Sequence, residues 1–377
     1  MRRSLLPVVV ALSLFAAACS GDDTAGDATT TTIDPVDAAR AYSEPGPYPV
    51  GVVTLALESG PMVEVWYPAV DGTTGTVSYD VRDFVPPAIR DVLTADIPAV
   101  YEFDGARDAN VADGEFPVVL FSHGFSGFRL QSSYLTSHLA SHGMVVVAPD
   151  HPSRDLLNVL GGSASGDRPE SVDELLQSLD LILAEATTKG SPFEGHIDAD
   201  HVAALGHSAG GGTALGAALD DRVDGYVAMA SGGPADGADY PDRPSFFLAG
   251  AIDGVVPPAE RTLPAYEAAP APSRYLEIAS VGHNGFDDLC TLGGGTGVIG
   301  IAEASGLGAV LDAQPQFRSL GEDGCVEPAA PVEEAFPIIR HAVTSWLRWL
   351  FEQDPEPVGL DREVEGAFDL GITIEAK

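Results

Sequence analysis

Six short, almost wholly apolar runs alternate with segments of helical spacing, and this alternation most constrains the fold of the chain. Strands that are apolar along their whole length are typical of a parallel sheet covered by helices on both faces. We therefore predict an α/β fold with a mostly parallel central sheet. The predicted sheet strands are residues 118–122, 145–149, 202–205, 225–230, 245–249 and 274–278, and the predicted helices are residues 134–142, 172–187, 209–219, 258–268 and 332–352.

Turn-forming sequences and changes in composition divide the chain into a hairpin, a large domain, an insertion and a tail. Residues 50–57 and 62–67 are β-branched, apolar and aromatic, and the turn-forming sequence between them predicts a β-hairpin. The 377 residues fit one large α/β domain. We place this domain at residues 45–353, with an insertion at 287–330, and expect residues 354–377 to form an acidic tail.

The charge of the chain excludes one class of partner. The formal net charge is -37, and Lys189 and Lys377 are the only lysines. Phosphate backbones are bound by clusters of Lys and Arg, so nucleic acid is not an expected partner.

The N-terminus predicts export. Arg2 and Arg3 precede an apolar run that ends in small residues directly before Cys19. This pattern is typical of a signal peptide, residues 1–18, and the run is shorter than the about 20 residues of a membrane span. Small residues before a cysteine resemble a lipobox, so we expect Cys19 to be lipidated and to anchor the protein to the cell membrane, with secretion as the alternative. Residues 19–44 are polar and small, as in a flexible linker.

Two further cysteines fit an oxidising compartment. With Cys19 used for lipidation, Cys290 and Cys325 remain as an even pair, and we predict a disulfide between them. The alternative is two free thiols.

A candidate nucleophile lies between a predicted strand and a predicted helix. Ser208 stands in the sequence Gly-His-Ser-Ala-Gly, after residues 202–205 and before residues 209–219. Strand, sharp turn and helix form the setting of a nucleophile elbow, where glycines on either side of the serine leave room for the turn. The sequence therefore predicts the α/β-hydrolase fold with Ser208 as nucleophile.

A serine hydroxyl needs a base, and the base needs an orienting carboxylate. In this fold the chain order is serine, acid, histidine. His283 follows the last predicted strand, whereas His341 lies inside the closing helix, so we assign His283 as base. Asp253 follows the strand at 245–249 and is the expected acid; Asp236 and Glu260 are the competing carboxylates.

Two backbone N–H groups must stabilise the oxyanion of the intermediate. We expect them to come from Ala209, directly after the nucleophile, and from Phe125, in the glycine-containing loop after residues 118–122. The Phe125 ring could also form an apolar wall for substrate or be a plain core aromatic.

This chemistry needs no metal or organic cofactor. His123, His151 and His207 lack the ligand spacing of a zinc site.

Several stretches resemble one branch of the α/β-hydrolases, the bacterial relatives of platelet-activating-factor acetylhydrolase, with cutinase-like poly(ethylene terephthalate) hydrolases as neighbours. The similar residues are 46–51, 63–68, 118–152, 206–212 and the loops around Asp253 and His283. In that resemblance Phe125 takes the place of the aromatic residue that donates an oxyanion amide. Where the polyester hydrolases usually carry Trp and Met beside the nucleophile, this chain has His207 and Ala209.

These observations predict a serine hydrolase that cleaves small or polymeric carboxylic esters through an acyl-enzyme. Polyester, phospholipid acetyl groups and amides are alternative substrates. A catalytically silent surface binding protein is the alternative from another class, although it gives no reason to keep Ser208, Asp253 and His283 together.

Overall fold

The structure is a computed structural model that describes residues 35–93, 96–234 and 238–377. The predicted signal peptide and Cys19 lie outside the described residues. Within the described ranges, no helix combines the length and the apolar character that crossing a membrane requires.

A ten-stranded sheet runs in the order β12-β11-β10-β9-β8-β6-β7-β2-β1-β5. The six strands from β11 to β7 pair in parallel, β2 pairs antiparallel with β7, and β1 and β2 form the predicted hairpin. The mostly parallel sheet of the prediction is confirmed. The strands are β1 (Val50–Ala56), β2 (Met62–Pro68), β5 (Ala106–Arg107), β6 (Phe116–Ser122), β7 (Val145–Pro149), β8 (Ile197–His207), β9 (Gly225–Met229), β10 (Ser245–Gly250), β11 (Ser273–Ile278) and β12 (Ile372–Ala376).

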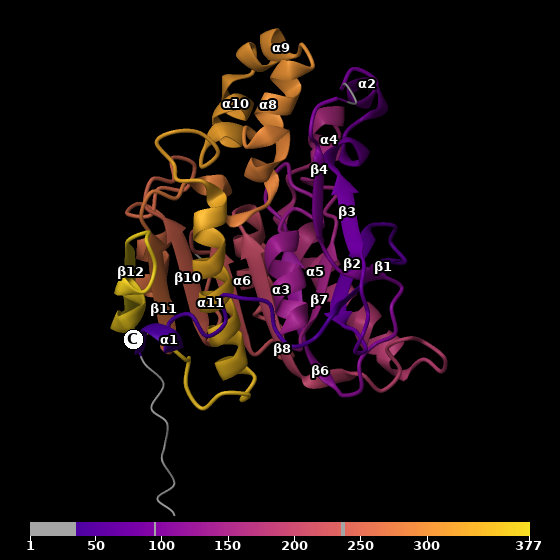
Figure 1. Ribbon diagram of the computed structural model, residues 1–377, viewed down its shortest axis with the longest axis vertical. Helices are drawn as coiled ribbons and strands as arrows, with labels where there is room; N and C mark the ends of the chain where they lie inside the picture. The colour runs from indigo at the N-terminus through magenta and orange to yellow at the C-terminus, as the bar shows by residue number, and fades with distance from the viewer. Residues whose placement is uncertain (1–34, 94–95, 235–237) are drawn as a thin grey trace, which may run out of the picture. The chain divides into compact units, whose positions relative to one another are not determined.

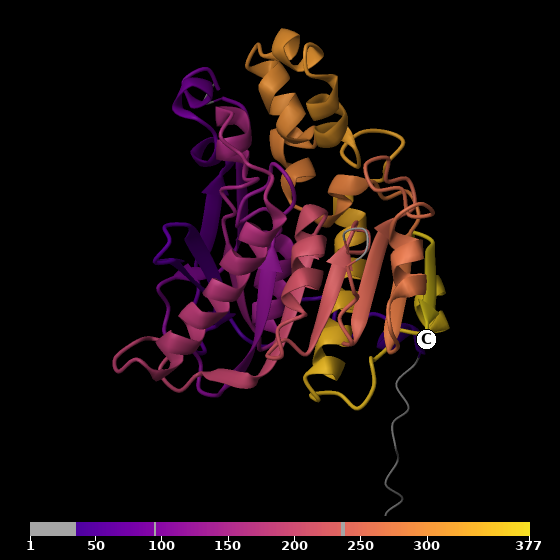
Figure 2. The same ribbon diagram turned by 180° about the vertical axis from the view of Figure 1, so that it is seen from behind.

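Helices cover both faces of this sheet because successive strand residues point to opposite sides. On β6, Val119 and Phe121 pack in one core cluster with α3 and α11, and Val118 and Leu120 pack in the other with α5, α6 and α7. Figure 1 shows α3 and α11 in front of the sheet, and Figure 2 shows the opposite face. The bounds are α3 (Ser133–Ser141), α5 (Arg168–Thr187), α6 (Ala209–Ala217), α7 (Thr262–Ala268) and α11 (Val332–Leu350).

The insertion forms a helical group at the carboxyl end of the parallel strands. It consists of η3 (Leu289–Gly294), α8 (Gly297–Ala304), α9 (Gly308–Asp312) and α10 (Pro315–Glu322). In Figures 1 and 2 this group stands opposite α2 (Pro87–Arg90) and α4 (Leu156–Gly161). The segment before α2, which the sequence left without assigned elements, contains β3 (Thr76–Asp80) and η1 (Val81–Phe84), and β4 (Val100–Asp104) pairs with β3.

The two ends of the described domain differ from the prediction. Residues 354–377 are not a separate acidic tail: after η4 (Arg362–Gly366), β12 pairs antiparallel with β11 and extends the sheet. The alternation of Ile372 and Ile374 with polar residues is a short strand pattern that the surrounding acidic residues obscured.

The last part of the predicted linker also packs on the domain. After α1 (Pro35–Ala38), the Arg40 Nε donates to the Ala367 carbonyl at 2.5 Å, and the Tyr42 hydroxyl donates to Asp354 Oδ2 at 2.6 Å. Residues 35–44 are therefore held by contacts distant in sequence, which local composition does not reveal.

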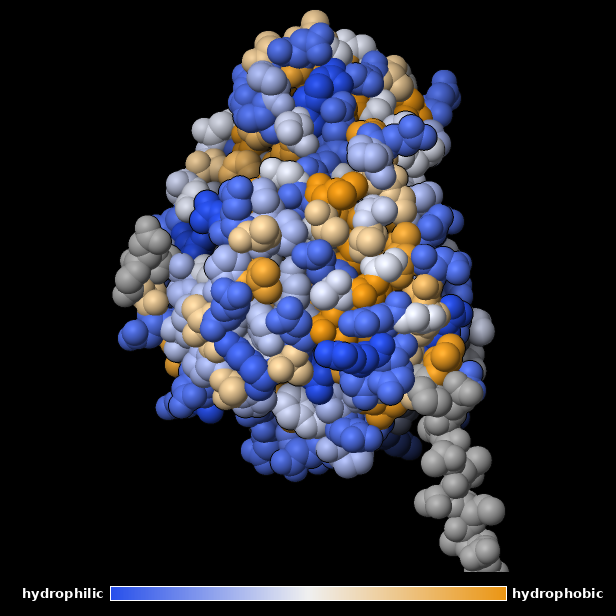
Figure 3. All heavy atoms as spheres, turned by 90° about the vertical axis from the view of Figure 1, so that its left-hand side faces the viewer, coloured by the Kyte–Doolittle hydropathy of each residue, from blue (hydrophilic) through white to orange (hydrophobic). Residues whose placement is uncertain are grey.

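The surface agrees with the acidic composition. The face in Figure 3 is mainly hydrophilic, with hydrophobic residues exposed in smaller areas between the polar ones. A surface rich in one sign of charge stays hydrated and repels its copies.

Candidate active site

Ser208 occupies a sharp turn between β8 and α6. Its backbone has φ 56° and ψ -121°, a left-handed conformation that is unfavourable for a residue with a side chain. A Cβ on Gly206 would lie 2.1 Å from the Gly210 carbonyl oxygen, and a Cβ on Gly210 would lie 1.9 Å from the Ser122 carbonyl oxygen. Both glycines are therefore required by close backbone approaches, and the turn presents a half-buried Ser208 at the end of the sheet.

The structure brings together Ser208, His283 and Asp253. The His283 Nε2 lies 2.9 Å from the Ser208 Oγ, and the His283 Nδ1 lies 2.9 Å from Asp253 Oδ2. His283 begins η2 (His283–Phe286) after β11, and Asp253 follows β10. Together with Ser208 after β8, all three residues come from the carboxyl ends of parallel strands in one sheet. His283 and Asp253 are both buried, with exposed fractions of 1% and 4%.

Backbone groups orient the acid. Asp253 Oδ1 accepts hydrogen bonds from the N–H groups of Val255 at 2.8 Å and Val256 at 2.6 Å. Its other oxygen is left to accept from the His283 Nδ1–H, so Nε2 faces the Ser208 hydroxyl as an acceptor. This is the arrangement in which an imidazole can take the proton of a serine.

Two backbone N–H groups near Ser208 are free of acceptors within the described residues. Ala209 begins α6, and the first N–H groups of a helix have no partner inside it. Phe125 lies in the loop after β6, where neither its N–H nor its exposed ring has a hydrogen-bond or ring-contact partner. Gly124 packs against Ser208, since a Cβ there would lie 3.2 Å from the Ser208 Cβ.

A buried chain of hydrogen bonds connects this loop to the base. Gln131 Oε1 accepts from the Gly124 N–H at 3.2 Å, and Gln131 Nε2 lies 3.1 Å from the His207 Nδ1. The His207 Nε2 donates to the His283 carbonyl at 3.0 Å. Burial lowers the pKa of His207 well below its usual value, which keeps the neutral form that both contacts require. Both ring nitrogens of His207 therefore have hydrogen-bond partners within the protein.

A second buried network lies behind residues 123–127, the loop after β6. Arg154 donates to the Ser122 Oγ at 2.7 Å and to the His123 carbonyl at 2.8 Å, while its own carbonyl accepts from the Ser126 N–H at 2.9 Å. The His151 ring lies between the Ser122 Oγ, at 2.9 Å, and Glu174 Oε2, at 2.7 Å.

Burial sets the protonation of this network. It raises the pKa of Glu174 to about 8, lowers the pKa of Arg154 to about 9, and lowers that of His151 well below its usual value. At neutral pH the Glu174 and His151 pair is therefore expected to be uncharged.

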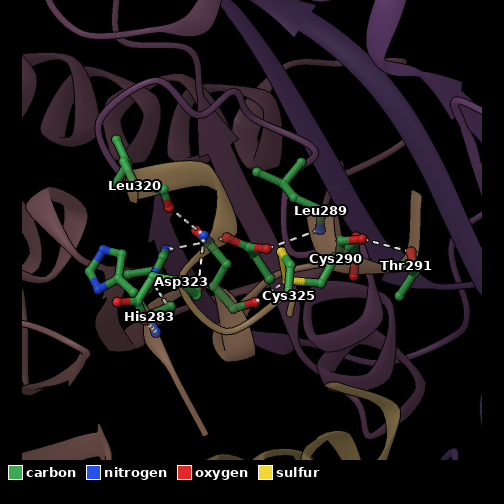
Figure 4. The surroundings of a disulfide bond; sticks show 11 residues. His283, Leu289, Cys290, Thr291, Leu320, Asp323 and Cys325 are labelled. Carbon is green, nitrogen blue, oxygen red and sulfur yellow. Dashed lines mark hydrogen bonds and ion pairs between the residues drawn. A yellow bond between two sulfur atoms is a disulfide. The ribbon is translucent and has the colours of Figure 1, made fainter. Parts of the chain in front are cut away.

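Asp323 of the insertion accepts hydrogen bonds from the loops that carry His283 and Asp253. Its Oδ1 accepts from the His283 N–H at 2.6 Å, and its Oδ2 accepts from the Gly254 N–H at 2.9 Å. Two residues further, Cys325 forms the predicted disulfide with Cys290, and Figure 4 shows the disulfide beside Asp323 and His283. Because Gly254 follows Asp253 directly, one carboxylate connects the loops of the candidate acid and base.

The competing residues have other surroundings. His341 is fully buried in α11, where its Nδ1 accepts from the Tyr42 N–H at 3.3 Å. Glu260 is exposed on a cleft that also contains Ser208, and Asp236 lies outside the described residues. Across the described ranges, no group of three or more His, Cys, Asp or Glu residues is arranged to hold a metal ion.

Sequence reasoning missed Asp323, Gln131 and Arg154. Asp323 carries a weak signal, since it lies two residues before Cys325, but the contacts of all three residues are long-range and depend on the folded topology.

The sheet, the elbow and the Ser–His–Asp arrangement define the class as the α/β-hydrolase fold with a serine hydrolase type of site. The family model described as PET hydrolase-like matches residues 107–301, just over half of the chain. The chain belongs to this family.

Known proteins of several kinds are similar to parts of the chain. Cutinase est1 of Thermobifida alba is 27% identical over 173 residues, 45% of this chain and 53% of the cutinase. The bis(hydroxyethyl) terephthalate hydrolase of Streptomyces coelicolor is 24% identical over 205 residues, 52% of this chain and 61% of that enzyme. The matches thus span little more than half the length of these relatives.

A solved structure extends the likeness in fold. The ferulic acid esterase from Streptomyces cinnamoneus superposes with a TM-score of 0.60 at 20% identity, covering 88% of this chain and 98% of that one. At this identity the comparison supports the α/β-hydrolase fold alone.

The Asp323 contacts predict a positioning effect. In Asp323→Asn only one side-chain oxygen can accept, so one of the two loop N–H groups loses its partner. We expect kcat for a soluble ester to fall by about tenfold, the scale of one charge-assisted hydrogen bond, with KM little changed. Asp312→Asn, on an exposed residue of the same insertion, is the control. Equal kcat values for Asp323→Asn and Asp312→Asn would contradict a positioning role of Asp323.

Glu174 predicts a pH effect on stability. Its pKa of about 8 in the folded state lies above the ordinary 4.5, so between these values the folded state holds a proton that the unfolded state has released. Stability from this group is lost as pH rises toward 8, and Glu174→Gln removes that loss because its amide cannot ionise.

Melting temperatures between pH 6.5 and 8 should therefore fall less steeply for Glu174→Gln than for wild type. The deprotonation of His151 in the unfolded state near pH 6.5 is common to both proteins and does not distinguish them. Asp173→Asn, at an exposed site on the same helix, should follow wild type. Parallel curves for wild type and Glu174→Gln would contradict the raised pKa.

Proposed function

We propose that the protein hydrolyses carboxylic esters by acyl transfer. Ser208 attacks the ester carbonyl while His283 takes its proton, and Asp253 orients the imidazole and stabilises its charged form. The N–H groups of Phe125 and Ala209 stabilise the oxyanion. His283 then protonates the leaving alcohol and activates the water that releases the acid.

One observation carries this proposal. Ser208, His283 and Asp253 come from three separate loops and form an unbroken chain of two 2.9 Å contacts. The strained backbone of Ser208 supports it, because strain of this kind is maintained where surrounding structure over-determines a functional geometry. A binding protein without catalysis has no need for either feature.

The comparisons with known proteins also favour particular ester substrates. Membership of the PET hydrolase-like family and similarity to a cutinase and a bis(hydroxyethyl) terephthalate hydrolase favour a polyester or its soluble fragments. The resemblance to the platelet-activating-factor acetylhydrolase branch makes phospholipid acetyl groups the second candidate. His207 and Ala209 at the positions beside the nucleophile distinguish this chain from the usual polyester hydrolases. We propose a soluble ester as the primary substrate.

Active-site labelling tests the reaction. A fluorophosphonate probe should label the wild-type protein at Ser208, mapped by mass spectrometry, because the activated hydroxyl attacks phosphorus as it attacks a carbonyl. Ser208→Ala should remain unlabelled, and its kcat on p-nitrophenyl acetate should fall by at least about a thousandfold. Folded wild-type protein that takes no label and cleaves no ester would sustain the silent binding protein instead. Polyester film and an acetylated phospholipid, assayed in parallel, separate the substrate candidates.

We also propose that the protein is exported and anchored to the cell membrane through lipidated Cys19. The supports are Arg2 and Arg3, the apolar run after them and the small residues before the cysteine. Ordinary secretion is the alternative location.

Fractionation tests the anchor. Cys19→Ala should move the protein from the membrane fraction to the medium, because the thiol that would carry the lipid is absent. Cys290→Ala controls for loss of another cysteine and should stay with the membrane. An unchanged distribution of Cys19→Ala would contradict lipidation.

A further inference from the structure

An apolar cavity of about 200 Å³ lies between the insertion and the helices opposite it. Val298 and Leu311 line it from α8 and α9, and Ile89 and Leu160 line it from α2 and α4. No charged residue of the described chain lines this cavity, although the protein as a whole carries a net charge of -37. A charge-free cavity in so acidic a protein fits an uncharged, apolar occupant.

The cavity adjoins the candidate catalytic residues. Phe125 and Asn284 both line it. Phe125 follows Gly124, which packs against Ser208, and Asn284 follows His283, whose Nε2 lies 2.9 Å from the Ser208 Oγ. The cavity wall is thus one residue away from two groups that touch the nucleophile.

Hydrogen bonds attach the insertion that lines the cavity to the loop that begins with His283. The Asn284 side chain donates to the Leu320 carbonyl at 2.7 Å and to the Asp323 carbonyl at 3.0 Å. Figure 4 shows Leu320 and Asp323 on the same side of the disulfide as His283. The insertion that encloses the cavity therefore keeps a set position relative to His283.

Much of the cavity lies outside the shared family pattern. The PET hydrolase-like match covers residues 107–301, whereas α2, α9 and α10 lie beyond it on either side. Several lining side chains remain partly open to solvent, among them Leu160 at 40% and Val310 at 60% exposure. Apolar side chains left exposed around a cavity mark a binding region rather than a completed core.

We propose that this cavity receives the hydrophobic group of the ester, an alkyl chain or aryl ring, and thereby sets the substrate specificity of the enzyme. This inference rests on the proposed ester hydrolysis at Ser208. Each buried methylene adds transfer free energy equivalent to roughly threefold to fourfold in affinity, so kcat/KM should rise with chain length until the cavity is filled. The remaining, more polar part of the substrate faces the cleft that contains Ser208 and Arg261.

Two ester series identify which side of the ester enters. In the first, p-nitrophenyl esters run from acetate to decanoate; in the second, acetates of alcohols run from ethanol to decanol, followed by acid release. Wild type should show a rise in kcat/KM in one series. Flat profiles in both series, with acetate still hydrolysed, would overturn the proposal.

Substitutions in one helix locate the effect. Ala302 lines the cavity, and Ala304, also in α8, is exposed and does not. Ala302→Trp should lower kcat/KM for the long esters by about tenfold or more while leaving acetate unchanged, and Ala304→Trp should change neither. Leu311→Ala, which enlarges the cavity, should move the optimum to longer chains.

Active-site labelling distinguishes failure of the proposed ester hydrolysis from failure of the cavity proposal. A small methyl fluorophosphonate should label Ser208 in every variant, which shows that each is folded and competent. Absence of label and of acetate hydrolysis in wild type would end the proposed function itself. Normal labelling with equal losses on short and long esters in Ala302→Trp would overturn the cavity assignment alone.

Discussion

The close approach of backbone at the Ser208 turn is the constraint on which the rest of the site depends. The first turn of α6 passes so near the end of β6 that no side-chain carbon fits on Gly210, because the Ser122 carbonyl occupies that place. The Ser208 N–H is also held by the Met229 carbonyl of β9, at 2.8 Å. Ser208, the loop after β6 and the neighbouring strands therefore have one relative arrangement, and the other loops of the candidate site are built around it.

Local patterns predicted most of the sheet and the three candidate catalytic residues. Apolar strands and helical spacing are properties of neighbouring residues, and the chain order of serine, acid and base follows from the strand order, so both can be recognised from sequence. The contacts of Gln131 and Asp323 cannot, because each connects loops far apart in the chain. The pairing of β12 with β11 was missed for a similar reason: five residues inside an acidic segment carry a strand signal only when their partner strand is known.

Two buried acids, Asp287 and Asp288, follow His283 in the chain. Burial raises the pKa of Asp287 and of Asp288 well above the usual value. Asp288 also accepts from the N–H groups of Ser133 at 2.6 Å and Tyr134 at 3.0 Å, which begin α3. A side chain from the loop after His283 thus serves as the missing N-terminal cap of a distant helix, because the Ser132 side chain does not cap it. The loop of the base and the start of α3 consequently stabilise each other.

The disulfide between Cys290 and Cys325 closes the insertion into a covalent ring spanning a separation of 35 residues. Such a ring alters what a protease can achieve. A single cut anywhere between the two cysteines leaves both new ends attached to the domain, one through Cys290 and the other through Cys325. Asp323 lies inside the ring, two residues before Cys325. A cut between Cys290 and Asp323 therefore leaves Asp323 attached to the domain through Cys325, beside the His283 loop that it contacts. To separate the two halves of the chain covalently, a cut within the ring would have to be combined with a reductant.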